Sequence, residues 1–340
     1  MQSAYPLVSV IIPHYNGEEI LRDCLQSLKK CTYPNFEIIV VDNGSTDEST
    51  LLVETEFPSV KLHKSTKNLG YSGGCNFGFR NSKGKYVVFL NNDTTQENDW
   101  LERLVEFAEK NPKVAALHPK LLYIKDKTLF DYSGAAGGEL DFLGFPFARG
   151  RVFFTVEKDE KQYDEPRQIF WASGTACFLR REVLNEVGLL DEDFFMHMEE
   201  IDLCWRINSA DYEVWSVPSA VVYHYSGASL GAESWFKVYL NYRNNILMLL
   251  KNYSGISLLK YLPIRIILDF VALVQAILKL EFWRAKGISK AYFWLLTKFR
   301  FALKKRKFAQ RDRKKADSEL PFYRKSIVWQ YFVKGKKTFR

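Results

Sequence analysis

Short hydrophobic runs that stop at polar residues dominate the first third of the chain. Residues 8–13, 36–41 and 86–90 are rich in β-branched and aromatic side chains, a composition typical of buried strands. Apolar residues recur at helical spacing over residues 20–28, and Asn16 with Glu19 resembles a capping box that opens this helix. Strand, helix and strand joined by short connections form a βαβ unit, so we expect the first two strands to be parallel neighbours.

Polar side chains follow two of these strands. Asp42 comes directly after the second strand, and Asn91, Asn92 and Asp93 come after the third. Ligands gather at the carboxyl edge of an open α/β sheet, and a carboxylate beside amide oxygens suits a hard divalent cation that carries phosphate oxygens. The sequence therefore predicts a metal anchor for a nucleotide diphosphate, although each aspartate could also be an ordinary turn residue.

Three glycines, Gly70, Gly73 and Gly74, precede a second helical pattern. They either let backbone N–H groups approach an anion or form a tight turn, and the pattern favours neither alternative. The spacing differs from the Gly-x-Gly-x-x-Gly of dinucleotide-binding Rossmann domains, and the acidic residue expected after their second strand is misplaced. A dinucleotide site is therefore the poorer interpretation.

The pattern loosens over residues 119–168, where glycines mix with aromatic residues, as in a mobile insertion that faces substrate. A strand-like run over residues 169–179 follows, and small residues interrupt it at Ser173 and Gly174. A glycine within such a run often marks close approach of a ligand or of another backbone. Trp171, in the same run, is either a platform for an acceptor sugar or a core aromatic residue.

Three carboxylates, Glu199, Glu200 and Asp202, fall within four residues at the start of a helical pattern. Like charges at this spacing repel one another, whereas a helix N-terminus favours negative charge. We therefore expect these acids to crowd the start of a helix and one of them to have a raised pKa. Asp202 is also explained by a simple helix-terminus charge. Residues 221–225 predict a further strand, with His224 near its end.

The C-terminal quarter differs in charge and in pattern. Residues 255–340 contain 22 Lys and Arg against 5 Asp and Glu, a net charge of +17, whereas residues 1–254 contain 26 against 35, a net charge of −9. Residues 255–283 and 291–308 are amphipathic, with cations beside broad apolar faces, which suits an anionic membrane surface. The longest charge-free run in the first of these segments is nine residues, and a bilayer span needs about 20, so we predict interfacial helices. Packing against the rest of the protein is the alternative.

The remaining composition excludes several classes of protein. The five cysteines are scattered and odd in number, which indicates neither a disulfide framework nor a zinc ribbon. The N-terminus has no basic region followed by an apolar run, so we expect no signal peptide and a cytoplasmic protein. No nucleic-acid-reading module is recognisable, so we expect no nucleic-acid partner. Nothing in the pattern indicates an oligomeric state.

Six ordered motifs together resemble the signature of family-2 glycosyltransferases with the GT-A fold, and in particular the bacterial rhamnosyltransferase-like enzymes of cell-surface polysaccharide synthesis. The motifs are VSVIIPHYN (8–16), VVDNGSTD (40–47), NLGYSGGCN (68–76), LNND (90–93), SG (173–174) and FMHMEEIDLCWR (195–206). The resemblance implies an α/β fold with a mixed sheet flanked by helices over residues 1–250. Residues 1–118 would bind the nucleotide sugar, residues 119–250 would bind the acceptor, and residues 255–340 would form a membrane-associating helical tail.

The resemblance also implies roles for individual residues. Asp93 would bind Mg²⁺ or Mn²⁺ that bridges the diphosphate of the donor, with His224 as a further ligand unless it is only a strand-end histidine. Glu200 would be the general base, with Glu199 as the alternative. The donor-binding residues would be Pro13, Tyr15, Asn16, Asp42, Asn68, Gly70, Asn91, Asn92 and Asp93. The acceptor-binding residues would be Trp171, Ser173, Gly174 and Asp202.

Two positions depart from the family pattern. Asn91 replaces the first aspartate of the Asp-x-Asp motif, which makes a metal more dependent on Asp93 and on the diphosphate. Glu200 stands where aspartate is usual, so the choice between Glu199 and Glu200 stays open. The Gln-x-x-Arg-Trp motif of processive relatives is absent, and residues 242–244 stand near its place, which favours addition of a single sugar.

The function implied is inverting, metal-dependent transfer of one sugar from a UDP- or dTDP-sugar to a hydroxyl group of a glycan or lipid-linked acceptor, at the inner face of the cell membrane. A catalytically silent scaffold that binds nucleotide sugars or membrane is the alternative from a different class. An enzyme needs a metal carboxylate, a base and a donor pocket, and the sequence predicts all three.

Overall fold

The structure, a computed structural model, describes residues 5–225 and 234–340. Its main sheet consists of β1 (Val8–His14), β2 (Phe36–Asp42), β3 (Lys61–Lys64), β4 (Tyr86–Leu90), β5 (Thr94–Gln96), β6 (Val114–Tyr123), β7 (Asp126–Phe130), β12 (Arg167–Gln168), β13 (Ala176–Arg180) and β14 (Glu213–His224). The strand order is β12-β14-β6-β13-β4-β1-β2-β3, with β5 beside β14 and β7 beside β6.

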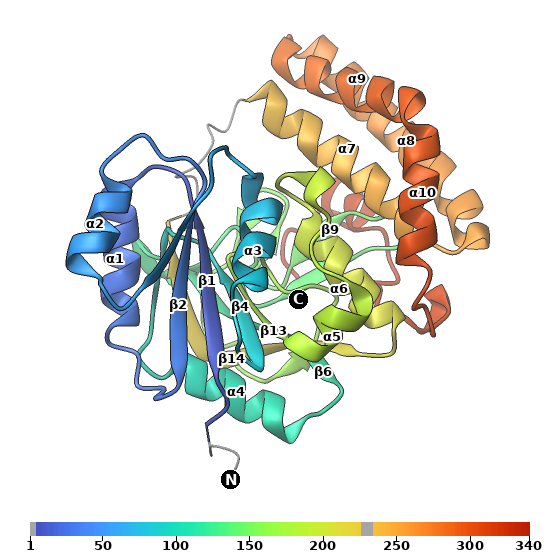
Figure 1. Cartoon of the computed structure of the whole chain (residues 1–340). Coiled ribbons are helices and arrows are strands. Elements are labelled where there is room, and N and C mark those ends of the chain that lie inside the picture. The colour runs from blue at the N-terminus through green and yellow to red at the C-terminus, as the bar shows by residue number, and fades with distance from the viewer. Residues whose placement is uncertain (1–4, 226–233) are drawn as a thin grey trace.

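Ten α-helices surround this sheet in the described part of the chain (Figure 1). They are α1 (Glu18–Leu28), α2 (Ser49–Glu56), α3 (Gly70–Arg80), α4 (Trp100–Lys110), α5 (Arg181–Val187), α6 (Glu199–Ser209), α7 (Trp235–Asn252), α8 (Gly255–Leu278), α9 (Phe282–Thr297) and α10 (Phe299–Ala309). Short helical turns are η1 (Glu192–Phe194), η2 (Asp317–Glu319) and η3 (Trp329–Val333).

The predicted βαβ unit is confirmed. β1 pairs in parallel with both β2 and β4, and His14 at the end of β1 lies opposite Asp42 at the end of β2. Because parallel strands end at the same edge, the segment that follows β4 reaches the edge that carries Asp42. β13 runs antiparallel to β4 and β6, which makes the sheet mixed.

Side chains of β1 alternate between two cores. Val10 and Ile12 lie in the core that α1, α2 and α4 cover, whereas Ile11 lies in the core that α3, α5 and α6 cover. Helix α3 sits close to the sheet because its glycines leave room: a Cβ atom on Gly78 would lie 2.3 Å from Ile11. Gly74, which lies against Pro13, and Gly78 thus serve helix–sheet packing, which neither sequence alternative included.

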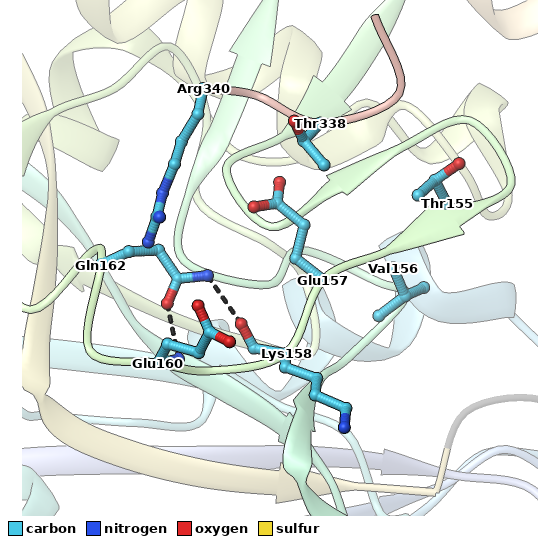
Figure 2. Close-up of a pocket in the computed structure, with 8 residues that line it drawn as sticks. All are labelled: Thr155, Val156, Glu157, Lys158, Glu160, Gln162, Thr338 and Arg340. Atoms are coloured by element: carbon cyan, nitrogen blue, oxygen red, sulfur yellow. Dashed lines mark hydrogen bonds between the residues drawn. The ribbon is translucent and has the colours of Figure 1, made fainter.

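Residues 119–168 form regular structure in place of the expected loose insertion. They contain a second, antiparallel sheet of β8 (Gly138–Leu140), β9 (Pro146–Ala148), β10 (Arg151–Val152) and β11 (Thr155–Val156). Phe147 and Val152 of this sheet pack with Ile327 and Tyr331 near the C-terminus. A surface pocket of about 350 Å³ opens between this sheet and the last residues of the chain (Figure 2). None of the site residues predicted from the sequence lines it.

Helices α7 to α10 lie together on one side of the molecule (Figure 1). Leu295 of α9 and Ala302 of α10 belong to the same buried core as Ile11, so the tail packs on the body. Helix α8 nevertheless leaves most of its surface exposed. By length and composition, this 24-residue helix could cross a membrane. An 18-residue window within it has a mean hydropathy of 1.9, and 17% of that window is buried.

Two of the charged residues of α8, Arg265 and Asp269, do not face outward. Arg265 and Asp269 form a buried ion pair with a separation of 3.0 Å. Asp269 also accepts a hydrogen bond from Tyr292 of α9, and Arg265 donates to the carbonyls of Leu143 and Gly144. A count of charge-free residues along the sequence is therefore a poor guide to this helix, because the charges that interrupt the apolar run face the protein.

Candidate active site

The edge formed by β1 and β2 carries several predicted donor-binding residues. Asp42 is buried, and its Oδ1 accepts a hydrogen bond from the Ser45 backbone N–H at 3.1 Å. Pro13 is also buried, and α3 approaches it so closely that a Cβ atom on Gly74 would lie 2.8 Å away. Tyr15, in contrast, is 52% exposed beyond the end of β1, where its ring is accessible to a ligand.

Asn16 organises the neighbouring loop but does not cap α1. Its Oδ1 accepts a hydrogen bond from the Thr46 backbone N–H at 2.8 Å, and Gly17, with a φ of 98°, is the N-cap residue and makes no side-chain cap. The predicted capping box is therefore wrong, because Asn16 uses its side chain to tie two loops of the edge together.

Asn68 and Gly70 shape the start of α3. Asn68 Oδ1 accepts a hydrogen bond from the Gly70 backbone N–H at 2.8 Å. Gly70 has a φ of 69°, and a Cβ atom there would lie 2.5 Å from the Phe195 ring. Glycine is required here both by the backbone conformation and by the close approach of the segment before α6. The predicted donor side and the segment that carries the predicted base thus come into contact.

Asp93 lies beside a histidine that two carboxylates hold. His224 Nε2 is 3.1 Å from Asp93 Oδ1, and His224 Nδ1 is 2.9 Å from Asp131 Oδ1. Asn91 Nδ2 lies 3.4 Å from the same Nε2 atom, and Asn92 contacts His14. Burial opposes the charged imidazole, but the hydrogen bonds to Asp131 and Asp93 outweigh it and raise the pKa of His224 to about 10.

These residues fit a divalent cation that a substrate helps to hold. Asp93 is buried and lies next to an imidazole nitrogen, an oxygen and nitrogen pair that Mn²⁺ accepts. In residues 5–225 and 234–340, no cluster of three or more His, Cys, Asp or Glu could hold a metal ion alone. Mg²⁺ and Mn²⁺ are commonly bound by one or two protein groups together with substrate phosphates, which matches this sparse set.

Glu199 and Glu200 open α6 in a different environment. Burial raises the pKa of Glu199 well above its usual range, and the charges of Glu200 and Asp202 add to this effect. Burial also raises the pKa of Glu200, to about 7. The Oε2 atom of each glutamate is buried and has no hydrogen-bond partner in the described part of the chain. The expectation that one of these acids has a raised pKa is therefore met by both.

The four residues before α6 form a strained loop, which we call the base loop (residues 195–198). Phe195, His197 and Met198 have φ angles of 65°, 69° and 73°, a conformation that non-glycine residues seldom adopt. The buried side chain of Asn244 on α7 donates hydrogen bonds to the carbonyls of Phe194, Met196 and His197, at 3.0, 2.9 and 2.8 Å. Because the Asn244 side chain holds the backbone of this loop in a strained conformation, we infer that the function of the loop requires this shape.

A chain of contacts connects the Asp93 side to the glutamates. The Asn91 backbone N–H donates to the Thr175 carbonyl at 2.9 Å, and the adjacent Gly174 carbonyl accepts from the Tyr71 hydroxyl. The charge of Glu199 acts on this Tyr71 hydroxyl and raises its pKa, although burial is the larger cause. Residues 173–175 therefore lie between the two groups of acids.

Three of the predicted acceptor-binding residues have structural roles. Trp171 is 3% exposed, and its indole N–H donates to the Glu139 carbonyl, so it is a core residue and does not offer a face to an acceptor. Ser173 is buried, and its hydroxyl donates to the Ser133 carbonyl. Asp202 is fully buried and pairs with Arg206 and Lys251, an internal ion-pair role that neither sequence alternative described. Gly174 is the member of this set that is partly exposed.

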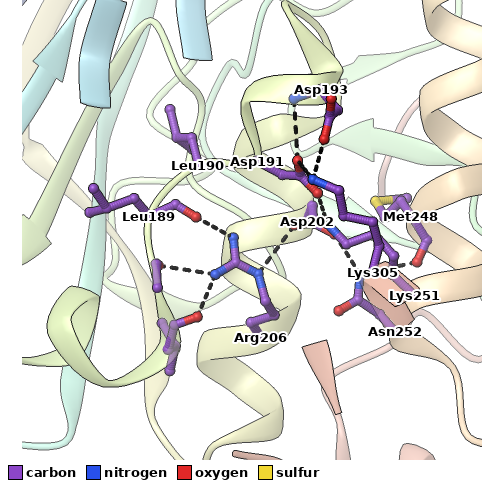
Figure 3. Close-up of polar contacts among 12 residues, drawn as sticks. Leu189, Leu190, Asp191, Asp193, Asp202, Arg206, Met248, Lys251, Asn252 and Lys305 are labelled. Carbon is purple, nitrogen blue, oxygen red and sulfur yellow. Dashed lines mark hydrogen bonds and ion pairs between the residues drawn. The ribbon is translucent and has the colours of Figure 1, made fainter. Parts of the chain in front are cut away.

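Asp202, in the first turn of α6, belongs to a buried ion-pair network (Figure 3). Lys251 of α7 bridges Asp202 at 3.0 Å and Asp191 at 2.6 Å, and Arg206 contacts Asp202 at 3.2 Å. Lys305 of α10 binds Asp191 from the other side. Burial opposes ionisation of Asp191, but these two lysines hold its pKa well below its usual range. Residues 304–307 form the basic run that the sequence predicted to face a membrane, and Lys305 of this run therefore points into the protein.

Sequence reasoning missed Asp131 and Asn244. Asp131 is fully buried after β7, and it orients His224 from a segment with no periodic pattern. Asn244 lies in the tripeptide of residues 242–244, which the sequence showed only as the absence of a processive motif. Asn244 stands in the largely polar run of residues 241–245, so the sequence did not mark it as a buried asparagine that requires partners.

Comparison with known proteins places this geometry in a family. The family model for glycosyl transferase family 2 matches residues 9–188. The chain is 28% identical over 273 residues to N-acetylglucosaminyl-diphospho-decaprenol L-rhamnosyltransferase of Mycobacterium tuberculosis, covering 75% of this chain and 87% of that protein. It is 30% identical over 238 residues to O-antigen biosynthesis protein RfbC of Myxococcus xanthus, covering 67% of this chain and 18% of that protein.

Other relatives are much longer than the matched region. An uncharacterized protein, y4gI of Sinorhizobium fredii, is 32% identical over 242 residues, and the match spans 67% of this chain but a quarter of that protein. The chain therefore corresponds to one part of some relatives and to most of the length of others.

Solved structures share the fold. GalNAc-T7, crystallised with UDP, GalNAc and Mn²⁺, superimposes with a TM-score of 0.62 at 17% identity, over 89% of this chain and 58% of that chain. The mannosyltransferase PcManGT of Pyrobaculum calidifontis, in complex with GDP-Man and Mn²⁺, gives a TM-score of 0.54 at 17% identity, over 91% and 86%. The mixed sheet with flanking helices is thus the GT-A fold, and the chain belongs to glycosyl transferase family 2 and is a glycosyltransferase.

Proposed function

We propose that the protein transfers a single sugar from a nucleotide-diphosphate sugar, UDP- or dTDP-linked, to a hydroxyl group, with inversion at the anomeric carbon. The observation that carries this proposal is the pair of acid groups on either side of residues 173–175. Asp93 Oδ1 lies 3.1 Å from His224 Nε2, a nitrogen that can bind a cation once the imidazole has released its proton, and Glu200 has a pKa near 7. The first setting suits a bound cation and the second suits proton transfer near neutral pH.

The transfer follows from these positions. The Glu200 carboxylate accepts the proton of the acceptor hydroxyl while that oxygen attacks C1 of the donor sugar. The new C1–O bond forms as the bond from C1 to the phosphate oxygen breaks, and the nucleoside diphosphate leaves with the electron pair. Asp93 would hold a divalent cation, with His224 as a second ligand once its imidazole has released a proton, and such a cation would stabilise the charge of that leaving group. Attack opposite to the leaving group inverts the anomeric carbon.

Glu200 suits the role of base better than Glu199. A base must be ionised at working pH, and a pKa near 7 gives a mixture of both forms in neutral solution. Burial and the charges of Glu200 and Asp202 raise the pKa of Glu199 well above its usual range, and its side chain is 4% exposed, so Glu199 favours the neutral form and suits hydrogen-bond donation. This distinction gives the two glutamates separate parts in one site.

The metal and the donor can be tested together without turnover. A ligand that binds only the folded state raises the melting temperature, so UDP- and dTDP-sugars are screened by thermal shift with and without Mn²⁺. We expect a shift that requires both the metal and the sugar nucleotide and that Asp93→Asn abolishes. Melting temperatures that manganese leaves unchanged for every donor would argue for the silent scaffold.

We further propose that the acceptor is a lipid-linked glycan and that the enzyme works at the inner surface of the cell membrane. The mycobacterial relative is named for a diphospho-decaprenol acceptor. Helix α8 turns an apolar face outward. Arg265 and Asp269 face the protein, whereas Ile267, Phe270 and Leu278 are 62%, 62% and 78% exposed. An outward apolar face of this extent is unfavourable in water and favourable at a bilayer.

Flotation with liposomes tests this attachment. We expect the protein to float with vesicles that contain phosphatidylglycerol and to remain partly bound at high salt, because apolar burial is insensitive to screening. Phe270→Asp, on the exposed face of α8, is expected to reduce flotation while nucleotide-sugar binding persists. Full release of wild type by salt would instead indicate attachment by charge alone.

A further inference from the structure

A cationic and aromatic surface lies where α9 crosses the first turn of α7. The ammonium groups of Lys286 and Lys290, one helical turn apart on α9, lie 4.7 and 4.9 Å from the centre of the Trp235 ring. Gly287 permits this crossing, because a Cβ atom there would lie 2.7 Å from the Trp235 carbonyl oxygen. With Lys237 of the same turn of α7, these residues form what we call the Trp235 cluster (Trp235, Lys237, Lys286 and Lys290).

The Trp235 cluster borders the base loop. The ring of Phe236 lies 6.5 Å from the ring of Phe195, which in turn fills the space above Gly70. The positive charge of Lys237 adds to burial in lowering the pKa of His197, which stands two residues before Glu199. A ligand that extends from the glutamates toward α7 therefore reaches this cluster.

Among the residues that the structure describes, the charge of the cluster is unbalanced. Helix α9 contains no acidic residue, and Glu281, which precedes it, pairs with Arg284 at 3.0 Å. Two ammonium groups over one ring repel each other, and in the described ranges 5–225 and 234–340 neither forms an ion pair. The N-terminus of α7, an 18-residue helix, adds positive potential. A multiply charged anion between the lysines would relieve this repulsion.

The outer face of α9 continues the cluster with apolar residues. Phe282, Phe293 and Leu296 are 63%, 69% and 80% exposed, and helical spacing places them on the same face as Lys286 and Lys290. This face runs beside the exposed apolar surface of α8. Charge for an anion and a path for a long hydrocarbon chain therefore occur together, next to the segment that carries the proposed base.

We propose that the Trp235 cluster binds the diphosphate of a polyprenyl-diphosphate-linked acceptor, with Lys286 and Lys290 as the principal cations and the apolar faces of α9 and α8 receiving the lipid chain. This inference rests on the proposed glycosyltransferase function and names the acceptor-recognition site that function requires. The sugar attached to the diphosphate would extend past Phe236 toward Glu200. The site selects acceptors by charge at one end and by hydrocarbon at the other.

The test uses the full chain and a soluble probe, farnesyl diphosphate, measured by isothermal titration calorimetry. Lys286→Ala combined with Lys290→Ala is expected to weaken its binding by roughly tenfold or more, since each lysine near an anionic group contributes about 1 kcal/mol. The control pair, Lys304→Ala combined with Lys307→Ala, removes the same charge from exposed positions on α10 and is expected to bind like wild type. Melting temperatures verify that each variant folds.

The outcomes separate this inference from its rivals. Equal loss of farnesyl diphosphate binding in both lysine pairs, or loss of flotation on phosphatidylglycerol vesicles with unchanged farnesyl diphosphate binding, would mean that the lysines serve bulk headgroups and would overturn the site. Binding of farnesol as tight as that of farnesyl diphosphate would overturn it as well. Failure here leaves Mn²⁺-dependent nucleotide-sugar binding intact, whereas failure of the proposed function removes that binding first.

Discussion

The two groups of acids in this protein differ in what surrounds them. Asp93 and Asp131 lie on opposite sides of His224, at 3.1 and 2.9 Å, and the imidazole between them is held in its charged form. Glu199 and Glu200 pair with no such cation in residues 5–225 and 234–340, and burial makes both hold their protons more tightly. Two carboxylates around one imidazole favour positive charge at that place, and a divalent cation can replace the imidazole proton there, whereas unmatched acids near neutral pKa favour proton transfer. Acidic residues thus serve two different purposes in this protein, and their surroundings decide which one.

The largest effect that tests this contrast is the loss of the base. Glu200→Gln keeps the shape of the side chain and removes its ability to accept a proton, so kcat should fall on the order of 10²–10⁴-fold. Nucleotide-sugar binding, measured by calorimetry, should stay close to wild type because Asp93 and His224 are unchanged. Glu199→Gln is the matched control, and a greater loss of kcat in that variant would transfer the role of base to Glu199.

The next effect concerns the network that anchors α6. Lys251→Met leaves Asp202 and Asp191 without their shared buried cation, and breaking a buried ion pair typically costs about 3–5 kcal/mol of unfolding free energy. Urea denaturation followed by circular dichroism measures this change. Lys314→Met is the control, because its 3.0 Å pair with Glu186 is largely exposed and should contribute less than about 1 kcal/mol. Similar losses in both variants would show that burial of the network is unimportant.

Local patterns predicted the donor side well. The strands that end at Asp42 and Asp93 were readable because each is a short apolar run followed at once by polar residues, and the βαβ rule brought both ends to one edge. The same local reading failed at Asn16. A capping box was plausible from four residues of sequence, but a loop 30 positions away offered Asn16 the Thr46 backbone N–H.

Long-range contacts on the base side could not be read from the sequence. Asp131 and His224 are 93 positions apart, and nothing in the spacing links them. The polar stripe of α8 was identified, but its direction depends on Tyr292 and on the carbonyls that receive Arg265. Likewise, Lys305 belongs to a basic run that suits a membrane, yet it binds Asp191 inside the protein. A sequence pattern shows which residues lie on the same face of a helix, but it does not show which part of the protein or of its surroundings that face contacts.

A smaller effect tests the support of His224 by Asp131. The residue behind a metal-binding histidine fixes its orientation, and removing such a partner typically weakens metal binding about 10–100-fold. Asp131→Ala is therefore expected to raise the Kd for Mn²⁺ in the presence of a nucleotide diphosphate, as measured by electron paramagnetic resonance. Asp131→Asn, which can still accept a hydrogen bond, should lose less.

The control for this experiment lies at the start of β7, the strand that Asp131 follows. Asp126→Asn changes an exposed carboxylate whose Oδ1 accepts only from Thr128, so manganese binding should be unaffected. If Asp131→Ala binds Mn²⁺ as tightly as wild type, then His224 does not take part in holding a cation, and the contrast between the two acid groups would rest on Asp93 alone.

The smallest effect is a displacement of pH dependence. Because Glu200 must be ionised to accept a proton, kcat/KM should rise with pH up to about 7 and then become level.

The raised pKa also means that the folded state binds the Glu200 proton more tightly than the unfolded state does. The stability that this protonated side chain contributes is therefore full at acid pH and is lost as pH rises through about 7. Glu200→Gln should remove that stability loss. Glu199→Gln should keep the inflection in kcat/KM near pH 7, because burial is the main cause of the raised pKa of Glu200. If the inflection instead moves well below pH 7, the two glutamates share one proton and act as a pair.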